Sequence, residues 1–214
     1  MANADTPFGL KPIRHRNGAP YNGSGNWYFI PSTYGTALFR GDPVIKMAAG
    51  SNTAKVSIAG VGDFAIGTLP EINNASAGDS KRITGAIVYF SPLPSDLTRV
   101  HNPASTERLA FVCDDPDVVF EIQADGAVAA ADIGLNAVLI YTHSGSTTSG
   151  LSGAELDTTS DVPAADASNQ LLIMRQVNRP DNETNLIHNK LEVLIANHTE
   201  VHGSTAAADG ILGI

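Results

Sequence analysis

Short runs of apolar residues, separated by residues that form turns, make up most of the chain. The clearest run is residues 118–123, in which Val118, Phe120 and Ile122 alternate with a valine, a glutamate and a glutamine. A period of two places alternate side chains on one face of a β-strand. Residues 190–196 repeat this pattern, with Leu191 as the first apolar residue. Both segments are therefore predicted to be strands with one face in the core.

Similar runs, each ended by Gly, Pro, Asp or Ser residues, predict further strands. They cover residues 27–30, 42–47, 54–59, 64–69, 83–90, 108–113, 137–141 and 171–177. One helical turn is predicted in the alanine-rich residues 127–133, which Gly134 ends. Turn signals every 8 to 12 residues or so, without an amphipathic helix, are typical of all-β proteins. The predicted fold is all-β, a β-sandwich or barrel of jelly-roll-like type.

Residues 1–25 lack this regular pattern. Pro7, Pro12 and Pro20 favour extended geometry in the residues before them, and so little apolar surface does not fold by itself. We therefore expect an extended N-terminal arm that becomes ordered only on another subunit, followed by a β-rich body over residues 26–214. A Ser/Gly/Thr-rich stretch at residues 143–160 predicts a long exposed loop. A subdivision of the body is placed near residues 142–170.

The charge of the chain limits the classes of partner that it is expected to bind. The 214 residues carry 13 Lys and Arg against 22 Asp and Glu, a net charge of −9. Binding of phosphate groups requires clustered positive charge, so neither nucleic acid nor a membrane is an expected partner. Residues 1–108 hold 10 basic and 7 acidic side chains, whereas residues 109–214 hold 3 and 15. This division favours head-to-tail attraction between copies, or two solvated faces without a contact role, and both interpretations stay open.

Residues 1–7 lack the basic and apolar regions of a signal peptide, and the single Cys113 cannot form an internal disulfide. We therefore expect a protein made and kept in a reducing cytosol. Cys113 is predicted to be a buried apolar residue rather than a nucleophile, since nearby aspartates raise the pKa of a thiol.

The sequence carries none of the common enzyme signatures, such as a phosphate-binding P-loop, a zinc-protease HExxH or a GxSxG elbow. Residues 114–117, DDPD, offer oxygen ligands for a cation, but they lack the spacing of a calcium loop. Aspartate beside proline is instead typical of a turn. We predict no catalytic residues, no metal site and no cofactor.

The opening residues 2–12, ANADTPFGLKP, resemble the start of a family of small structural proteins encoded beside the major capsid protein in tailed bacteriophages. Shorter similarities lie at residues 41–44, 114–117, 120–123 and 191–198. The resemblance implies a capsid decoration, or cement, protein: an all-β module on the outer surface of the virion that clamps adjacent shell subunits. The implied partners are the major capsid protein and other copies of the chain, as a homo-dimer or homo-trimer.

Five residues of the arm match the N-terminal motif region of that family. Our hypothesis is that they bind the capsid or a neighbouring copy: Phe8, Lys11, Pro12, Arg14 and Arg16.

The alternative is a carbohydrate- or receptor-binding β-sandwich module of a phage tail. Its candidate stacking residues are Trp27, Tyr28, Tyr34, Tyr89 and Tyr141. Aromatic residues make up 6% of the chain, which is low for such a role, and aromatic residues in strands usually belong to the core.

Overall fold

The computed structural model describes residues 3–47, 54–58, 62–67, 69–77 and 81–201. These residues form strands and one short 3₁₀ helix, η1 (Ala130–Asp132), so the prediction of an all-β fold is confirmed. In chain order the strands are β1 (Lys11–His15), β2 (Asn26–Ile30), β3 (Pro43–Met47), β4 (Ala54–Ile58), β5 (Gly62–Gly67), β6 (Glu71–Asn74), β7 (Gly85–Phe90), β8 (Arg108–Cys113), β9 (Val118–Gln123), β10 (Asn136–Ala137), β11 (Leu139–Tyr141), β12 (Ala154–Leu156), β13 (Leu171–Gln176) and β14 (Lys190–Ile195).

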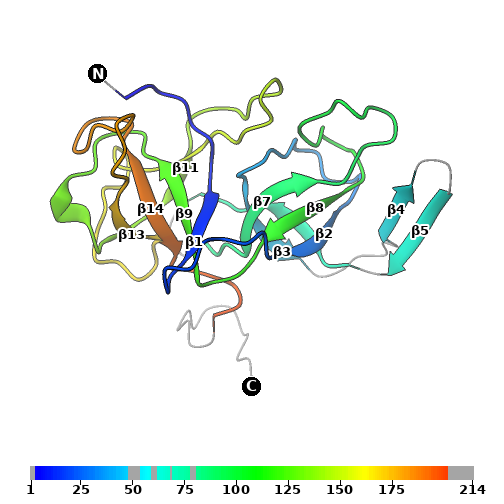
Figure 1. Ribbon diagram of the computed structural model, residues 1–214, viewed down its shortest axis with the longest axis horizontal. Helices are drawn as coiled ribbons and strands as arrows, with labels where there is room; N and C mark the ends of the chain where they lie inside the picture. Colours follow the sequence, from blue (N-terminus) through cyan, green and yellow to red (C-terminus); the bar gives the residue numbers. More distant parts are fainter. Residues whose placement is uncertain (1–2, 48–53, 59–61, 68, 78–80, 202–214) are drawn as a thin grey trace.

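One half of the molecule is a five-stranded antiparallel sheet in the order β1-β9-β14-β13-β10 (Figure 1). The period of two in β9 gives the predicted result, because Val118, Phe120 and Ile122 all lie in the main hydrophobic core. The opposite face of β9 is also buried, although it carries Glu121 and Gln123. This second face therefore needs polar partners, which the N-terminal residues and several arginines supply.

The other half is a closed barrel in the order β2-β6-β3-β7-β8 (Figure 1). The pair β2 and β6 is parallel, and the other strand pairs of the barrel are antiparallel. Two smaller sheets, β4-β5 and β11-β12, complete the strands. Residues 26–113 thus supply the whole barrel, while four strands of the large sheet come from the acidic half of the chain.

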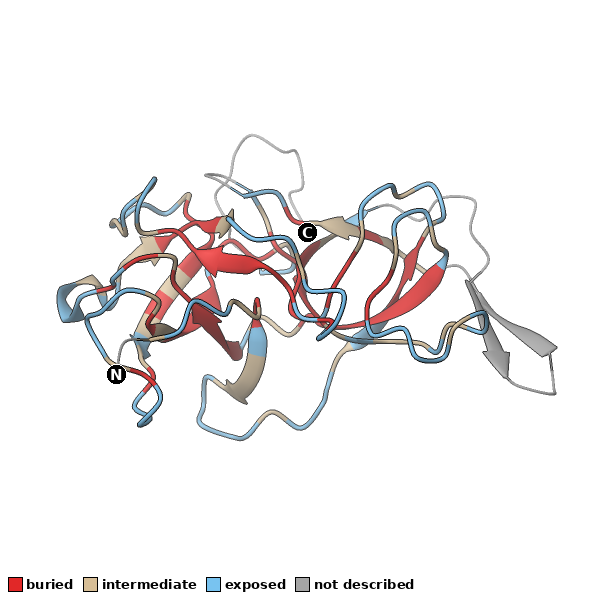
Figure 2. Cartoon of the chain, turned by 90° about the horizontal axis from the view of Figure 1, so that it is seen from above, coloured by how far each residue is buried: buried red, intermediate tan, exposed pale blue. Residues whose placement is uncertain are grey.

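The barrel has a core cluster of its own, around Ile30, Val44 and Val112, but the core of the sheet also reaches two barrel strands. Ala86 of β7 and Cys113 of β8 belong to the same buried cluster as Phe120, Leu171 and Leu191 of the sheet side. Figure 2 shows buried residues continuing from one half of the molecule into the other. The two halves therefore pack against each other through a continuous buried cluster.

The structure corrects the prediction that the N-terminal residues have no fold of their own. Residues 11–15 form β1, which pairs with β9 at the edge of the sheet, and Leu10 is completely buried in the core. After β1 the chain folds back on itself, so that residues 19–21 lie beside the strand. His15 N donates to Ala19 O (2.7 Å), and Tyr21 N donates to Ile13 O (3.3 Å). The expectation of an arm ordered only by another subunit is therefore wrong for this segment.

Two other strand assignments also change. The predicted loop at residues 143–160 contains β12, which is buried and pairs with β11, so only part of it is exposed. Strand β6 was not predicted, because its sequence EINN has a single strongly apolar residue. Among the described residues there is no helix long and apolar enough to cross a membrane.

Candidate functional site

Residues 3–10, called here the N-terminal strap, cross the surface between the sheet and the barrel and are held at both ends (Figure 1). The Asn3 amide group donates to the carbonyls of Glu183 (2.9 Å) and Ile187 (3.0 Å). In the middle, Thr6 N donates to Gln123 Oε1 (2.9 Å), and Gln123 Nε2 donates to the Ala4 carbonyl (2.7 Å). The buried Gln123 therefore fixes the path of the strap over the sheet.

The strap meets the barrel at a close crossing of two glycines. Leu10 N donates to Gly41 O (2.8 Å), and Gly9 and Gly41 have φ angles of +73° and +88°. A β-carbon on Gly41 would lie 2.2 Å from the Phe8 carbonyl oxygen, so no larger residue fits without moving the backbone. Both positions require glycine because of the left-handed φ and the contact.

A cleft of about 760 Å³ opens beside the strap, within the usual size range of ligand sites. It lies where the strap, the barrel and the loop of residues 142–153, called here the serine loop, come together. Its lining comprises Thr6, Pro7, Phe8, Leu10, Lys11, Pro12, Arg40, Gly41, Ile87, Val88, Glu121, His143, Ser144, Ser146, Ser149, Leu151, Ser152, Arg179 and Lys190. Apolar strap residues, serine hydroxyls and basic groups thus face one space.

The basic groups around the cleft differ in how far they are already paired. The Arg179 guanidinium binds both carboxylate oxygens of Glu121 and also Asp181, and Lys190 binds Asp181 at 2.6 Å. The hydrogen bond to Glu121 raises the pKa of Arg179, so the guanidinium stays charged. Arg40 donates to the Ser149 carbonyl (2.7 Å). These contacts hold the positive side chains at the rim in fixed positions.

The Lys11 ammonium makes no ion pair with any residue that the structure describes, and its side chain is exposed. In a chain with net charge −9, the cleft is lined by four basic side chains and one acidic side chain, Glu121. The chemistry that it can bind is an acidic side chain or chain terminus with an apolar neighbour to contact Phe8.

The five predicted arm residues separate into two groups. Phe8, Lys11 and Pro12 line the cleft together. Arg14 instead donates to Glu192 Oε2 from Nε (3.0 Å) and Nη2 (2.7 Å), on the buried polar face of the sheet. Arg16 lies outside the cleft and is 3.9 Å from Asp117. Arg14 and Arg16 are thus occupied within the chain.

The Arg14 contact belongs to a network that neutralises two adjacent glutamates. Glu121 and Glu192 are partners across β9 and β14, and both are buried. Burial alone would raise the pKa of Glu192, but hydrogen bonds from Arg175 and Arg14 hold it below its usual value. Arg14, from the basic first half of the chain, thus pairs with Glu192 of the acidic second half within one molecule.

Residues 114–117 contain the turn that was predicted from aspartate beside proline. Asp115 Oδ1 accepts from Asp117 N (2.8 Å), and Asp114 Oδ2 accepts from the Tyr28 hydroxyl (2.7 Å) and from Asn26 Nδ2 (2.8 Å). The prediction that Cys113 is buried is also confirmed. Burial, together with nearby groups that include Asp114 and Asp115, raises its pKa to about 12.

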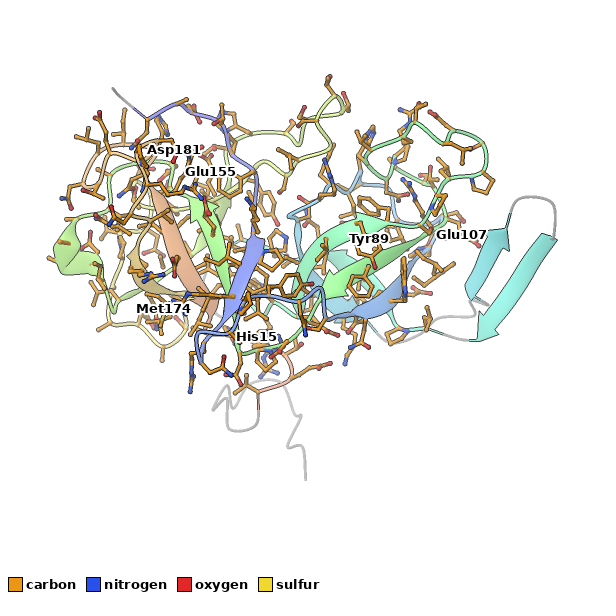
Figure 3. The ribbon with its side chains drawn as sticks, viewed as in Figure 1. His15, Tyr89, Glu107, Glu155, Met174 and Asp181 are labelled. Atoms are coloured by element: carbon orange, nitrogen blue, oxygen red, sulfur yellow. The ribbon has the colours of Figure 1, made fainter. Side chains whose placement is uncertain are left out.

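The candidate stacking residues of the alternative function also separate. Trp27 and Tyr89 are 36% and 44% exposed, and both contact Phe111 on the outside of the barrel, at ring distances of 5.3 Å and 4.7 Å. Figure 3 shows Tyr89 on this face. By contrast, the hydroxyls of the other three tyrosines hydrogen-bond to the body, namely those of Tyr28, Tyr34 and Tyr141.

The strap residues that line the cleft were predicted from the sequence, but the residues of the opposite wall were not. Arg40 forms an isolated β-bridge with Leu151, and the serine loop has no periodic pattern. No local feature of the sequence therefore indicates that either lies beside the strap. The abundance of serine in residues 144–152 was the one available hint. Comparison with known proteins found no matching family model, no matching curated protein and no matching solved structure.

Proposed function

We propose that this protein is a capsid decoration protein of a tailed bacteriophage, which binds the outer shell through the cleft beside the strap. One observation carries the proposal: the N-terminal residues that resemble the decoration family form a wall of this cleft, with Phe8, Lys11 and Pro12 facing it. A rigid all-β body with a preformed cleft suits a clamp, because little conformational entropy is lost on binding.

In this proposal, an acidic segment of the major capsid protein enters the cleft and contacts Lys11 and Arg40. Phe8 and Pro12 supply the apolar contact that such a segment buries. Each contact is weak, but copies bound around a shell hold one another in place, because the loss of one copy competes with rebinding at high effective concentration. The protein thereby reinforces the shell against the pressure of packaged DNA.

Self-association as a dimer or trimer on the shell is part of the same proposal. The half of the chain that forms most of the large sheet is strongly acidic, while the first half, which includes the barrel, is slightly basic. Rim contacts between the acidic face of one copy and the cleft cations of the next would weaken as salt increases.

The test is co-sedimentation of the purified protein with empty capsids. Removing residues 1–20 is a poor test, because it also removes β1 and the buried Leu10. Lys11→Gln is the sharper variant, and Arg16→Gln is its matched control, since it removes the same charge from an exposed side chain outside the cleft. We expect Lys11→Gln to weaken capsid binding about tenfold, which corresponds to about 1.4 kcal/mol, and Arg16→Gln to change it less than twofold.

Equal binding by wild type and Lys11→Gln would contradict the role of the cleft. Particles with and without the protein should also differ in the temperature at which they release DNA. If the two release curves coincide, the protein binds the shell without reinforcing it, and the decoration function is wrong.

A carbohydrate-binding tail module is the second candidate, and the exposed Trp27 and Tyr89, which pack on the buried Phe111, favour it. Such clusters stack on the apolar faces of sugar rings. A hit on a glycan array that Trp27→Ala abolishes, in a protein that does not sediment with capsids, would replace the decoration function with this one.

A further inference from the structure

Three potential metal ligands from distant parts of the chain meet at the strap. They are Asp5 of the strap, His143 of the serine loop and Glu155 of β12. The His143 imidazole lies between the two carboxylates, with Nδ1 3.0 Å from Glu155 Oε2 and Nε2 3.4 Å from Asp5 Oδ2. One ligand atom from each residue lies within 4.8 Å of the others. Figure 3 shows Glu155 beside the upper end of the large sheet.

Glu155 supplies an independent reason to expect a ligand here. Its side chain is 0% exposed, whereas those of Asp5 and His143 are 42% and 44% exposed. Glu155 Oε2 accepts from the Thr142 hydroxyl and contacts His143, but its Oε1 is buried without a hydrogen-bond partner among the described residues. A buried carboxylate with an unpaired oxygen is costly unless a cation compensates it.

A second orphaned atom faces Asp5 from the other side. His188 Nδ1 is buried, has no hydrogen-bond partner in the described part of the chain, and lies 3.8 Å from Asp5 Oδ1. The Asp5 carboxylate is therefore flanked by the imidazoles of His143 and His188, and the buried Glu155 carboxylate contacts Nδ1 of His143. Two carboxylates that share a site with imidazole nitrogens match a divalent cation in both charge and ligand type.

We propose that Asp5, His143 and Glu155 bind a divalent transition-metal ion, for which Zn²⁺ is the best match. In tetrahedral zinc sites with bonds of 2.0 to 2.2 Å, the ligand atoms lie about 3.3 Å apart. The 3.0 Å separation of His143 Nδ1 from Glu155 Oε2 is close to this value, so Nδ1 is the nitrogen that would bind the ion. The 3.4 Å contact to Asp5 is made by the other nitrogen, Nε2. Asp5 would complete the site by rotating its exposed side chain, since one ligand atom of each of the three residues already lies within 4.8 Å of the others.

The ion would fasten the strap to the body. Asp5 precedes Thr6, Pro7 and Phe8, which form one wall of the cleft, while His143 lies in the opposite wall. A bond from Asp5 through a metal to Glu155 therefore joins the two walls at one end of the cleft. Metal binding is a property of the isolated chain, so it is tested without capsids and independently of the decoration function.

The experiment is calorimetric titration of Zn²⁺ into the full chain after treatment with a chelator. We expect one ion per chain, with Ca²⁺ and Mg²⁺ binding at least tenfold more weakly, because the site contains an imidazole. Asp5→Asn and His143→Ala should each weaken Zn²⁺ binding by tenfold or more. Asp5 is exposed, so Asp5→Asn should keep the fold, whereas His143→Ala removes a partner of the buried Glu155. His143→Ala and Glu155→Gln are therefore interpreted only if the circular dichroism spectrum is unchanged.

The matched control is His15→Ala. His15 Nδ1 lies 3.4 Å from Asp115 Oδ2, which resembles the His143–Asp5 pair, but no third ligand joins them in the described structure, and Figure 3 shows His15 far from Glu155. This variant should bind Zn²⁺ as the wild type does. A second measurement is hydrogen exchange at Thr6 N, which Zn²⁺ should slow in the wild type but not in Asp5→Asn.

Three results would overturn the proposal. The first is the absence of binding at millimolar Zn²⁺. The second is equal affinity in wild type and Asp5→Asn, which places any bound ion elsewhere. The third is tighter binding of Ca²⁺ than of Zn²⁺, which contradicts a site built around an imidazole.

Discussion

Gly41→Ala tests the crossing of the strap and the barrel, on which the shape of the cleft depends. A left-handed φ costs a residue with a β-carbon about 1–2 kcal/mol. At φ +88° the new β-carbon would also lie 2.2 Å from Phe8 O, so the strap has to move away. That movement breaks the Leu10–Gly41 hydrogen bond, worth about 1 kcal/mol, and exposes part of the buried Leu10, worth about 1–2 kcal/mol. The expected total loss of unfolding free energy is about 3–5 kcal/mol.

Gly18→Ala is the control for backbone strain. Gly18 has nearly the same φ, +92°, but a β-carbon there would meet nothing within 4 Å. This variant should therefore lose only the strain term, about 1–2 kcal/mol. The difference between the two variants isolates the contact between strap and barrel, which we expect to be about 2–3 kcal/mol.

Urea denaturation followed by circular dichroism measures both losses. Limited proteolysis adds a local measurement, because a displaced strap should be cut near residues 3–10 before the body unfolds. If Gly41→Ala loses no more stability than Gly18→Ala, the strap does not cross the barrel as described. The strap would then not form a wall of the cleft.

Two further predictions concern buried charges. Burial raises the pKa of Asp42 to about 6, so its contribution to stability is complete below about pH 4 and is lost as the pH rises through 6. In urea denaturation, the unfolding free energy of Asp42→Asn should therefore rise by about 2–3 kcal/mol relative to wild type between pH 4 and pH 7. Parallel pH profiles for the two proteins would contradict this. Arg14→Met should lower the unfolding free energy by about 1–3 kcal/mol, because it leaves the buried Glu192 with Arg175 as its remaining described partner. The control Arg16→Met should lower it by less than about 0.5 kcal/mol. Equal thermal midpoints for the two variants would contradict the assignment of Arg14 to the sheet.

The strands with a period of two were predictable, because one face of each enters the core. Residues 118–123 and 190–195 form β9 and β14 as expected, with Phe120 and Val193 opposite each other. Strand β1 was missed, since its sequence KPIRH has no alternation and contains a proline. It forms because an edge strand has an unpaired side and the pairing has a bulge between Pro12 and Arg14.

The site was predictable only from one side. The sequence indicated that the arm carries binding chemistry, but charge alone did not reveal which basic residues were already paired. The partner of Arg14, Glu192, lies 178 positions away, and nothing local marks it. The Asp5, His143 and Glu155 cluster was missed for the same reason, since its members share no spacing motif.

The connectivity of the chain sets the order in which the protein assembles during synthesis. All five barrel strands lie between residues 26 and 113, so every barrel strand is synthesised before β9, β13 and β14. Strand β1 has to wait for β9, which follows it by about a hundred residues, and the barrel brings the two together by shortening that loop. The barrel is thus an insertion within the sheet, and the strap is among the last parts of the molecule to reach its final place.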